Sequence, residues 1–263
     1  LAAHPQRRQQ AGAMVAATLN LVTDYLGAPV TRAVIPAAGG QHRLLASHLM
    51  QRLLLQSMAE AASVGVYEFL LVLAPGSEEA LYRPLQTALG LGDAVQRAAG
   101  WVGQEFFLVL LPDEMLDQRL SQTMPGELQN MRRAAKNLHP APLIAVEAVA
   151  KSRLPVGGVV RLGRKSQGPR LFQDEELLEK PAPAHPILAT PTSRSIVGRY
   201  FLPPDIFPAL AAVRTQGHQP LELTTALEYL RRQGMPVYAY ELKKSRRDLG
   251  GVIEQAGGLL GDI

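Results

Sequence analysis

Three apolar runs separated by helix-like segments constrain the fold of this 263-residue chain more than any other feature. The runs are EFLLVL at 68–73, FFLVLL at 106–111 and the segment 143–149. Each run is apolar at consecutive positions, so both of its faces need cover by other elements, as in the strands of a parallel sheet. The alternation of such strands with helical segments therefore predicts an α/β fold with a mostly parallel central sheet.

The chain changes character after residue 150, where Pro and Gly become frequent and apolar residues alternate over short stretches. These stretches, at 158–162, 171–178 and 196–202, predict a smaller antiparallel layer beside the sheet. We therefore expect three parts: a helical extension at 1–30, an α/β core at 31–150, and a part at 151–263 that contains the antiparallel layer and the C-terminal helices.

The composition allows a large buried core and excludes several kinds of chemistry. Hydrophobic residues make up 47% of the chain and charged residues 19%, which is typical of a globular protein. The chain has no cysteine, which excludes thiolate catalysis and cysteine zinc sites and is compatible with a reducing cytosol. The net charge of +4 is a mild excess, the basic residues are scattered, and no apolar run reaches transmembrane length. We expect a cytoplasmic protein that binds neither a nucleic acid polymer nor a membrane.

A glycine-containing turn follows the first expected strand, at 31–36. The segment from Ala37 to Arg43 reads Ala-Ala-Gly-Gly-Gln-His-Arg. Glycine after a strand lets the backbone approach a phosphate, a following helix N-terminus favours anions, and Arg43 supplies a positive charge. The spacing is not that of the dinucleotide-binding fingerprint, and a purely structural tight turn fits the sequence about equally well.

Two aspartates are candidate metal ligands. Asp113 follows the strand at 106–111, at the edge where open α/β sheets bind ligands, and a carboxylate there is suited to hold Mg²⁺ against nucleotide phosphates. A helix cap or turn explains Asp113 equally well. Asp248, in the sequence Arg-Asp-Leu-Gly, is either a second metal ligand or the cap of a last helix.

The sequence Glu179-Lys180-Pro181 places opposite charges side by side. Proline holds the chain extended, so neighbouring side chains are expected to point to opposite sides. The carboxylate then accepts hydrogen bonds from sugar hydroxyls while the ammonium meets a phosphate. The alternative, which the motif alone favours, is a solvated ion pair at the end of a strand.

These pieces occur in the same order as the motifs of a known family. The matching segments are AVIPAAG at 33–39, LPD at 111–113, GGVV at 157–160, EKP at 179–181, IVGRY at 196–200, ELTTAL at 222–227 and DLG at 248–250. Any one of these motifs is loose, but seven in the right order are specific. From residue 31 onward the chain therefore resembles the bacterial UTP–glucose-1-phosphate uridylyltransferases, the family that makes UDP-glucose.

The resemblance implies a Rossmann-like nucleotidyltransferase fold with a sugar-binding layer, and a transferase reaction of sugar-nucleotide biosynthesis. The phosphate of glucose 1-phosphate attacks the α-phosphorus of UTP and pyrophosphate leaves, which needs positioning and charge neutralisation rather than a protein nucleophile. The implied catalytic residues are Arg43 and Asp113. The implied nucleotide contacts are Ala37, Ala38, Gly39, Gln86 and Gly92, the sugar-phosphate contacts are Gly158, Glu179 and Lys180, and the Mg²⁺ ligands are Asp113 and Asp248. The resemblance also implies a homodimer or homotetramer.

The chain departs from the family pattern at several of these places. Gln41 replaces the second glycine of the phosphate turn, Ser193 replaces an asparagine, Thr225 replaces an aspartate, and Val252 replaces a lysine. The loop that follows Arg43 looks short and has no counterpart of a lysine that neutralises phosphate, and the loop before residue 90 looks short as well.

Two interpretations follow from these departures. The first is an enzyme of ordinary mechanism, whose two short loops are incomplete in this sequence. The second is a catalytically impaired paralogue that binds a sugar nucleotide or regulates an active homologue. The joint presence of Arg43, Asp113, Glu179, Lys180 and Asp248 favours the enzyme.

Overall fold

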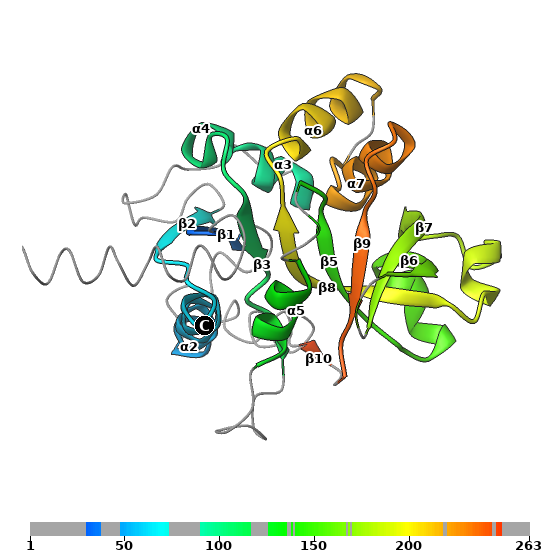
Figure 1. Ribbon diagram of the computed structural model, residues 1–263, viewed down its shortest axis with the longest axis horizontal. Helices are drawn as coiled ribbons and strands as arrows, with labels where there is room; N and C mark the ends of the chain where they lie inside the picture. Colours follow the sequence, from blue (N-terminus) through cyan, green and yellow to red (C-terminus); the bar gives the residue numbers. More distant parts are fainter. Residues whose placement is uncertain are drawn as a thin grey trace, which may run out of the picture.

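The computed structural model contains an eight-stranded sheet with helices on both of its faces (Figure 1). Its strands are β1 (Arg32–Ala37), β2 (Glu68–Leu73), β3 (Phe107–Leu110), β5 (Leu143–Glu147), β6 (Gly158–Lys165), β7 (Leu171–Glu179), β8 (Ser193–Leu202) and β9 (Tyr238–Glu241). A separate small sheet pairs β4 (Glu114–Leu116) with β10 (Arg246–Asp248). The structure describes residues 30–37, 48–73, 90–116, 126–135, 138, 140–166, 168, 170–217, 220–243 and 246–248.

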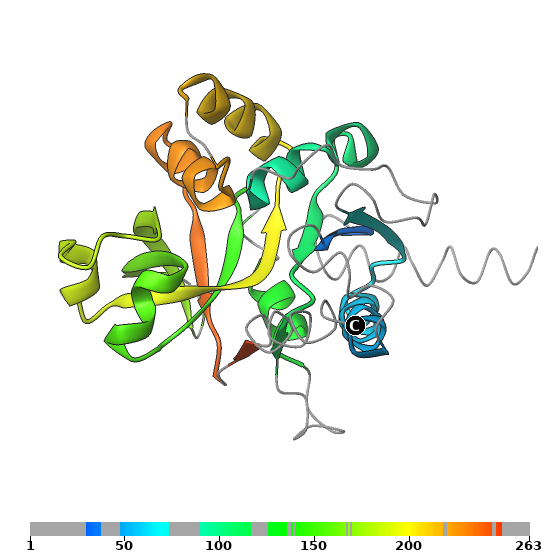
Figure 2. The same ribbon diagram turned by 180° about the vertical axis from the view of Figure 1, so that it is seen from behind.

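The helices fall into two groups on opposite sides of the sheet. Their bounds are α2 (His48–Ala62), α3 (Leu91–Gln96), α4 (Ala99–Val102), α5 (Glu127–Ala135), α6 (Ile206–Thr215) and α7 (Leu223–Arg232), with 3-10 turns η2 (Lys151–Val156) and η3 (Pro186–Ala189). Helices α3, α4, α6 and α7 lie together at the top of Figure 1, and α2 and α5 lie on the other side of the strands. Figure 2 shows the same two groups from behind.

The two faces of the sheet build two hydrophobic cores. Successive residues of a strand point to opposite faces. In β3, Phe107 and Val109 pack on the side of α6 and α7, where Phe107 stacks on Phe207 with ring centroids 5.3 Å apart. Leu108 and Leu110 pack on the opposite side, against α2 and α5. The runs that are apolar at every position are therefore covered on both faces, as the sequence predicts.

The expected direction of the strands in the sheet needs correction. We predicted a mostly parallel sheet, whereas the strand order is β2-β1-β3-β8-β5-β9-β7-β6 and β8 runs antiparallel to both β3 and β5. Among the described strands of this sheet, only the pairs β1–β2, β1–β3 and β5–β9 are parallel. The segment at 196–202 was predicted for the antiparallel layer beside the sheet, and β8 does run antiparallel to its neighbours, but it lies inside the central sheet between β3 and β5. The sheet is therefore mixed.

The strand β8 is also long enough to connect the strands of the expected α/β core with the β6–β7 hairpin. Its first residues, Ser193–Ser195, pair with β6, while Arg199–Leu202 pair with β3. The pairings β8–β5, β5–β9, β9–β7, β7–β6 and β6–β8 form a closed ring of five strands. The antiparallel layer that we expected beside the sheet is thus continuous with it.

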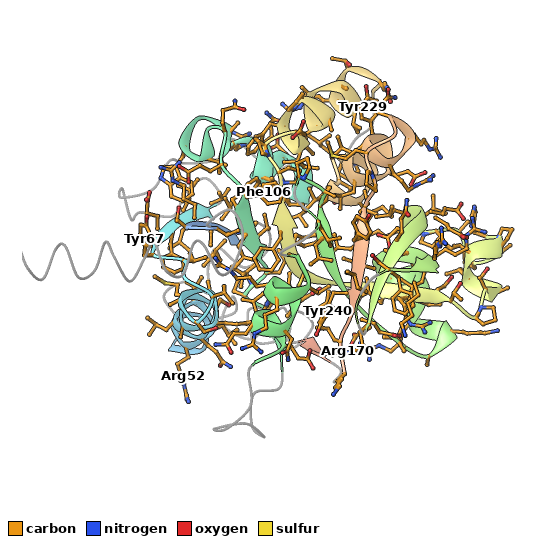
Figure 3. The ribbon with its side chains drawn as sticks, viewed as in Figure 1. Arg52, Tyr67, Phe106, Arg170, Tyr229 and Tyr240 are labelled. Atoms are coloured by element: carbon orange, nitrogen blue, oxygen red, sulfur yellow. The ribbon has the colours of Figure 1, made fainter. Side chains whose placement is uncertain are left out.

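The loop of the hairpin between β6 and β7 spans 166–170. Arg170 ends this loop with a left-handed φ of 67°. Its Nη1 donates to both carboxylate oxygens of Glu127 on α5, at 3.2 and 2.9 Å. Its guanidinium also lies 4.7 Å from the ring centroid of Tyr240 on β9, and Figure 3 shows these two side chains together. Arg170 therefore ties the hairpin to the main sheet.

Most expected elements are present within a few residues, and β2 has the predicted bounds. The short elements α4, β4 and β10, and the helix α5, were not predicted. The helical extension expected at 1–30 lies, apart from residue 30, outside the described residues. Within the described ranges, no helix has both the length and the hydropathy to cross a membrane.

Candidate functional site

The strand β7 ends at Glu179, and the chain turns sharply at the next residue. Lys180 has a left-handed φ of 43°, and its backbone N–H donates to the carbonyl of Gly157 at 3.0 Å. We expected an extended segment with the two side chains on opposite sides. Instead the left-handed residue turns its side chain back, and Lys180 Nζ lies 3.7 Å from Glu179 Oε1. The side chain of Lys180 is 60% exposed, so its ammonium is accessible to a ligand.

Gly158 lies opposite Glu179 in the β6–β7 ladder. A Cβ atom at Gly158 would stand 2.8 Å from Thr224 Oγ1, 2.8 Å from Ile196 Cδ1 and 3.2 Å from Glu179 Oε2. Thr224, in the first turn of α7, uses this space to donate a hydrogen bond of 2.7 Å to Glu179 Oε2. Only glycine at 158 leaves room for the carboxylate and the helix to meet.

Glu222 completes this group and connects it to a second predicted segment. It lies just before α7, and its Oε1 is 3.7 Å from Lys180 Nζ. Its Oε2 accepts a hydrogen bond of 3.4 Å from the backbone N–H of Leu91, between Gly90 and Gly92. We name Gly158, Glu179, Lys180, Glu222 and Thr224 the Lys180 cluster.

The glycines at 90 and 92 allow this second segment to lie directly on the residues before α7. Gly90 has a φ of 104°, a conformation that favours glycine. A Cβ atom at Gly92 would stand 2.7 Å from the carbonyl oxygen of Leu221. The structure therefore brings Gly92 and Lys180, which are far apart in the sequence, to the two sides of Glu222.

The electrostatics of the Lys180 cluster combine one ammonium with two carboxylates. Burial raises the pKa of Glu179, and the negative charge of Glu222 raises it further. The hydrogen bond from Thr224 and the positive charge of Lys180 act in the opposite direction and do not fully offset the increase. A half-buried carboxylate beside an exposed ammonium can accept hydrogen bonds from hydroxyls while the ammonium contacts an anion.

Asp113 lies in a turn between β3 and β4. The backbone N–H of Leu111 donates to the carbonyl of Gly198 on β8 at 2.9 Å, and the N–H of Glu114 donates to the carbonyl of Leu111 at 3.3 Å. The N–H of Gly198 in turn donates to the carboxylate of Glu114. A Cβ atom at Gly198 would stand 2.5 Å from the Cβ of Leu111, so glycine is required there. We name residues 111–114 the Asp113 turn.

The pairing of β4 with β10 brings the two candidate metal ligands to neighbouring strands. In the register of this small sheet, Asp248 lies opposite Glu114, and Glu114 directly follows Asp113 in the sequence. The side chain of Asp248 is not among those described. Among the described side chains, no group of three or more His, Asp or Glu is placed to hold a metal ion.

The strand β8 joins the Lys180 cluster to the Asp113 turn. Ile196 borders Gly158, and Gly198 borders Leu111. Two residues of a strand span about 7 Å, and residues two apart point to the same face. The motif IVGRY therefore places its isoleucine and its glycine against two different predicted site segments.

Most of the predicted phosphate turn lies outside the described residues. Ala38, Gly39 and Arg43 lie there, as does Gln86. Ala37 is the last residue of β1, which is parallel to β3, so these strands point their carboxyl ends to one edge of the sheet.

Glu222 and Thr224 are the residues that we had not assigned to a site. Both belong to the segment ELTTAL, whose match to the family motif was the available signal. Of the four departures from the family pattern, Ser193 is explained structurally, because its Oγ donates to the carbonyl of Ile187 at 2.5 Å. Thr225 lies half-buried on α7, and the structure offers no reason for it. Gln41 and Val252 lie outside the described residues.

Comparison with known proteins finds relatives by sequence over part of the chain. The UTP–glucose-1-phosphate uridylyltransferase of Streptococcus pneumoniae is 35% identical over 162 residues, which are 61% of this chain and 51% of that protein. The enzyme of the same name from Streptococcus pyogenes is 30% identical over 161 residues, 61% of this chain and 50% of that protein. The chain thus spans about half the length of these relatives. No protein-family model matches the sequence.

Solved structures share the fold over most of the chain. UDP-glucose pyrophosphorylase in complex with UDP-glucose superposes with a TM-score of 0.69 and 22% identity, over 89% of this chain and 99% of that chain. The UTP-bound enzyme from Acinetobacter baumannii superposes with a TM-score of 0.63 and 23% identity, over 88% and 93%. A putative glucose-1-phosphate thymidylyltransferase from Bacillus anthracis gives 0.64 at 14% identity, over 88% and 95%. These likenesses establish the nucleotidyltransferase-like α/β fold that the sequence predicts. Over 61% of its length the chain is therefore similar in sequence to bacterial UTP–glucose-1-phosphate uridylyltransferases.

Proposed function

We propose that the chain is a nucleotidyltransferase that forms UDP-glucose and pyrophosphate from UTP and glucose 1-phosphate. The observation that carries this proposal is the Lys180 cluster, in which Glu222 connects the ammonium of Lys180 to the backbone of Leu91. The Lys180 cluster thus joins the segment that is expected to hold the sugar phosphate to the segment that is expected to flank the uracil. The sequence relationship to uridylyltransferases supports the same reaction.

The Lys180 cluster provides groups suited to a sugar phosphate. Lys180 is exposed and contacts the phosphate, while the carboxylate of Glu179 accepts from the sugar hydroxyls. Gly158 keeps this part of the site open, because a side chain there would fill the space beside Glu179 and Thr224. In this proposal the ammonium moves from its two carboxylate neighbours to the phosphate when the substrate binds.

The nucleotide occupies the edge of the sheet at the carboxyl ends of β1 and β3. Ala37, Ala38 and Gly39 line it, Arg43 meets the triphosphate, and Gly92 flanks the uracil. Gln86 reads the edge of the base. The backbone N–H groups and glycines of such segments permit the close approach that phosphates and a planar base need.

Asp113 and Asp248 are the proposed ligands of Mg²⁺. The backbone placement of Asp248 beside Glu114 fits this role, since Mg²⁺ is usually bound by one or two carboxylates together with substrate phosphates. When bound, the ion supplies positive charge that lowers the repulsion between the phosphates of the nucleotide and the attacking sugar phosphate.

The reaction then requires no protein nucleophile. An oxygen of the glucose 1-phosphate attacks the α-phosphorus of UTP, the bond from that phosphorus to the β-phosphate oxygen breaks, and pyrophosphate leaves with the bonding electrons. Lys180 holds the attacking phosphate in place and Arg43 neutralises the triphosphate, so the protein contributes position and charge.

We further propose that the protein works in the cytoplasm, as a homodimer or homotetramer, with a nucleotide-binding part at 31–150 and a sugar-phosphate-binding part at 151–263. The absence of cysteine is consistent with a reducing compartment. Light scattering after size-exclusion chromatography measures the oligomeric state, and a monomer at micromolar concentration refutes that part of the proposal.

The experiment that tests the function compares turnover with binding. Release of pyrophosphate from UTP, glucose 1-phosphate and Mg²⁺ is measured for the wild type, for Lys180→Met and for Lys151→Met, which changes an exposed lysine at the start of η2. We expect turnover in the wild type and Lys151→Met and at least a tenfold loss in Lys180→Met, as for one preorganised charged group. A wild type that UDP-glucose stabilises thermally, but that shows no turnover, supports the impaired paralogue instead.

A further inference from the structure

Arg199 of β8 is among the largest fully buried side chains of the described residues, although it carries a charge. Its side chain is 1% exposed, and its partner Glu60 on α2 is also buried. Arg199 Nε donates to Glu60 Oε1 at 3.0 Å, and Nη2 donates to Glu60 Oε2 at 2.8 Å. Two parallel hydrogen bonds of this kind fix the plane of the guanidinium as well as its position.

The third nitrogen of the same guanidinium contacts the Asp113 turn. Arg199 Nη1 donates to the carbonyl of Leu111 at 2.9 Å and to the carbonyl of Gly198 at 3.0 Å. Leu111 precedes Pro112 and Asp113, so this hydrogen bond holds the chain two residues before the candidate metal ligand. One guanidinium therefore connects α2, β8 and the Asp113 turn.

The energy of the pair does not explain why it is buried. A buried ion pair contributes little net stability, because the cost of desolvation offsets the attraction. Burial lowers the pKa of Arg199, while the negative charge of Glu60, together with Glu114 and Asp113, raises it and outweighs burial. Arg199 therefore stays charged in the interior, and its distinctive property is a rigid geometry directed at the Asp113 turn.

We propose that Arg199 and Glu60 are positioning residues that hold the Asp113 turn against β8 and α2 and so set the place of the Asp113 carboxylate. The inference rests on the proposed role of Asp113 as a metal ligand. It gives Arg199, the arginine of the motif IVGRY, a structural role that the motif alone did not indicate. It also links Asp113 to α2, the helix that begins at His48, five residues after Arg43 of the candidate phosphate turn.

The test uses Arg199→Lys, which keeps the charge and loses the planar fork. Arg170→Lys is the matched control, because Arg170 also makes two hydrogen bonds to one carboxylate, and its described hydrogen bonds go to Glu127, Glu241 and Tyr240 rather than to the Asp113 turn. Two quantities are measured on each folded variant: the rate of hydrogen exchange at the Glu114 amide without ligands, and the affinity for Mn²⁺ in the presence of UTP by electron paramagnetic resonance.

We expect Arg199→Lys to exchange the Glu114 amide at least tenfold faster than wild type and to bind Mn²⁺ about tenfold more weakly, the usual effect of losing a group that orients a metal ligand. Arg170→Lys should change neither quantity. If Arg199→Lys does not fold, the double variant Arg199→Met with Glu60→Leu replaces the pair by apolar residues of similar volume, and the same two results are expected.

The proposal is overturned if folded Arg199→Lys, or the double variant, matches Arg170→Lys in both measurements. A third variant separates this failure from failure of the metal assignment. If Asp113→Asn binds Mn²⁺ as wild type does, Asp113 is not the ligand. The exchange rate of the Glu114 amide then still decides whether Arg199 positions the turn.

Discussion

The ammonium of Lys180 lies 3.7 Å from the carboxylate of Glu222, although the two residues are on separate elements, the end of β7 and the start of α7. The same carboxylate accepts a hydrogen bond from the backbone of Leu91. A single acidic side chain thus connects the expected sugar-phosphate side of the site to the expected base side.

This contact predicts the effect of removing one negative charge. Glu222→Gln keeps an acceptor for the Leu91 N–H and leaves Lys180 freer to bind phosphate. We expect the KM for glucose 1-phosphate to fall about threefold with little change in kcat, because an ion pair whose ammonium is exposed contributes up to about 1 kcal/mol. Steady-state kinetics measure this, with the exposed Glu175→Gln on β7 as control. An unchanged or higher KM in Glu222→Gln contradicts the role assigned to Lys180.

Two adjacent glycines give a sharp steric test. A Cβ atom at Gly158 meets Thr224 and Ile196 at 2.8 Å, whereas a Cβ atom at Gly157 meets nothing within 4 Å. Gly158→Ala should separate Thr224 from Glu179, destabilise the protein by about 1–3 kcal/mol and raise the KM for glucose 1-phosphate at least tenfold. Gly157→Ala should resemble the wild type in urea denaturation and in kinetics. Equal behaviour of the two variants would show that the space at Gly158 has no function.

Asp174 predicts a dependence of stability on pH. It is buried in β7, and neither of its carboxylate oxygens has a hydrogen-bond partner within the described part of the chain. Burial raises its pKa well above the ordinary value, the positive charge of Arg231 lowers it, and the negative charge of Glu228 raises it.

The folded state then binds this proton more tightly than the unfolded state, whose aspartate has a pKa of about 3.9. The free energy of unfolding therefore falls as the pH rises from that value toward the raised pKa of the folded state. Asp174→Asn should remove this decrease and be more stable than the wild type at pH 8. Thermal unfolding at pH 5 and pH 8 measures it, with the exposed Asp205→Asn as control. A parallel pH profile in Asp174→Asn and wild type would refute it.

The proposed role of Asp113 as a metal ligand predicts that replacing this residue selectively reduces metal-dependent activity. Asp113→Ala removes the proposed ligand from a partly buried turn and leaves the backbone hydrogen bonds of the turn in place. We expect the folded variant to lose turnover by at least a hundredfold, because Mg²⁺ is usually held by only one or two carboxylates together with the substrate phosphates. Wild-type activity in Asp113→Ala at limiting Mg²⁺ would rule out this assignment.

Local sequence patterns predicted the elements better than their pairing. The bounds of β2 follow from a buried apolar run, which is a local feature of the sequence. The segment of β8 was predicted to be antiparallel, but its neighbours depend on which strands it meets after folding, and the local pattern does not show that it enters the central sheet between β3 and β5. The sheet was therefore predicted as mostly parallel and is mixed.

The sequence likewise predicted only part of the site, because contacts between distant segments leave no local pattern. Gly158, Glu179 and Lys180 were found through ordered motifs, and the structure places them together. The partner of Arg199 could not be predicted, because Glu60 is 139 residues away and nothing in its helix marks it. The predicted direction of the Lys180 side chain was wrong, because no sequence signal marks a lysine that adopts a left-handed φ.

The most direct test of the proposed function is the amount of UDP-glucose and pyrophosphate formed from UTP and glucose 1-phosphate with Mg²⁺. We predict that the wild type forms the two products in equal amounts, at a rate that falls at least tenfold in Lys180→Met. The account is contradicted if the folded wild type forms neither product.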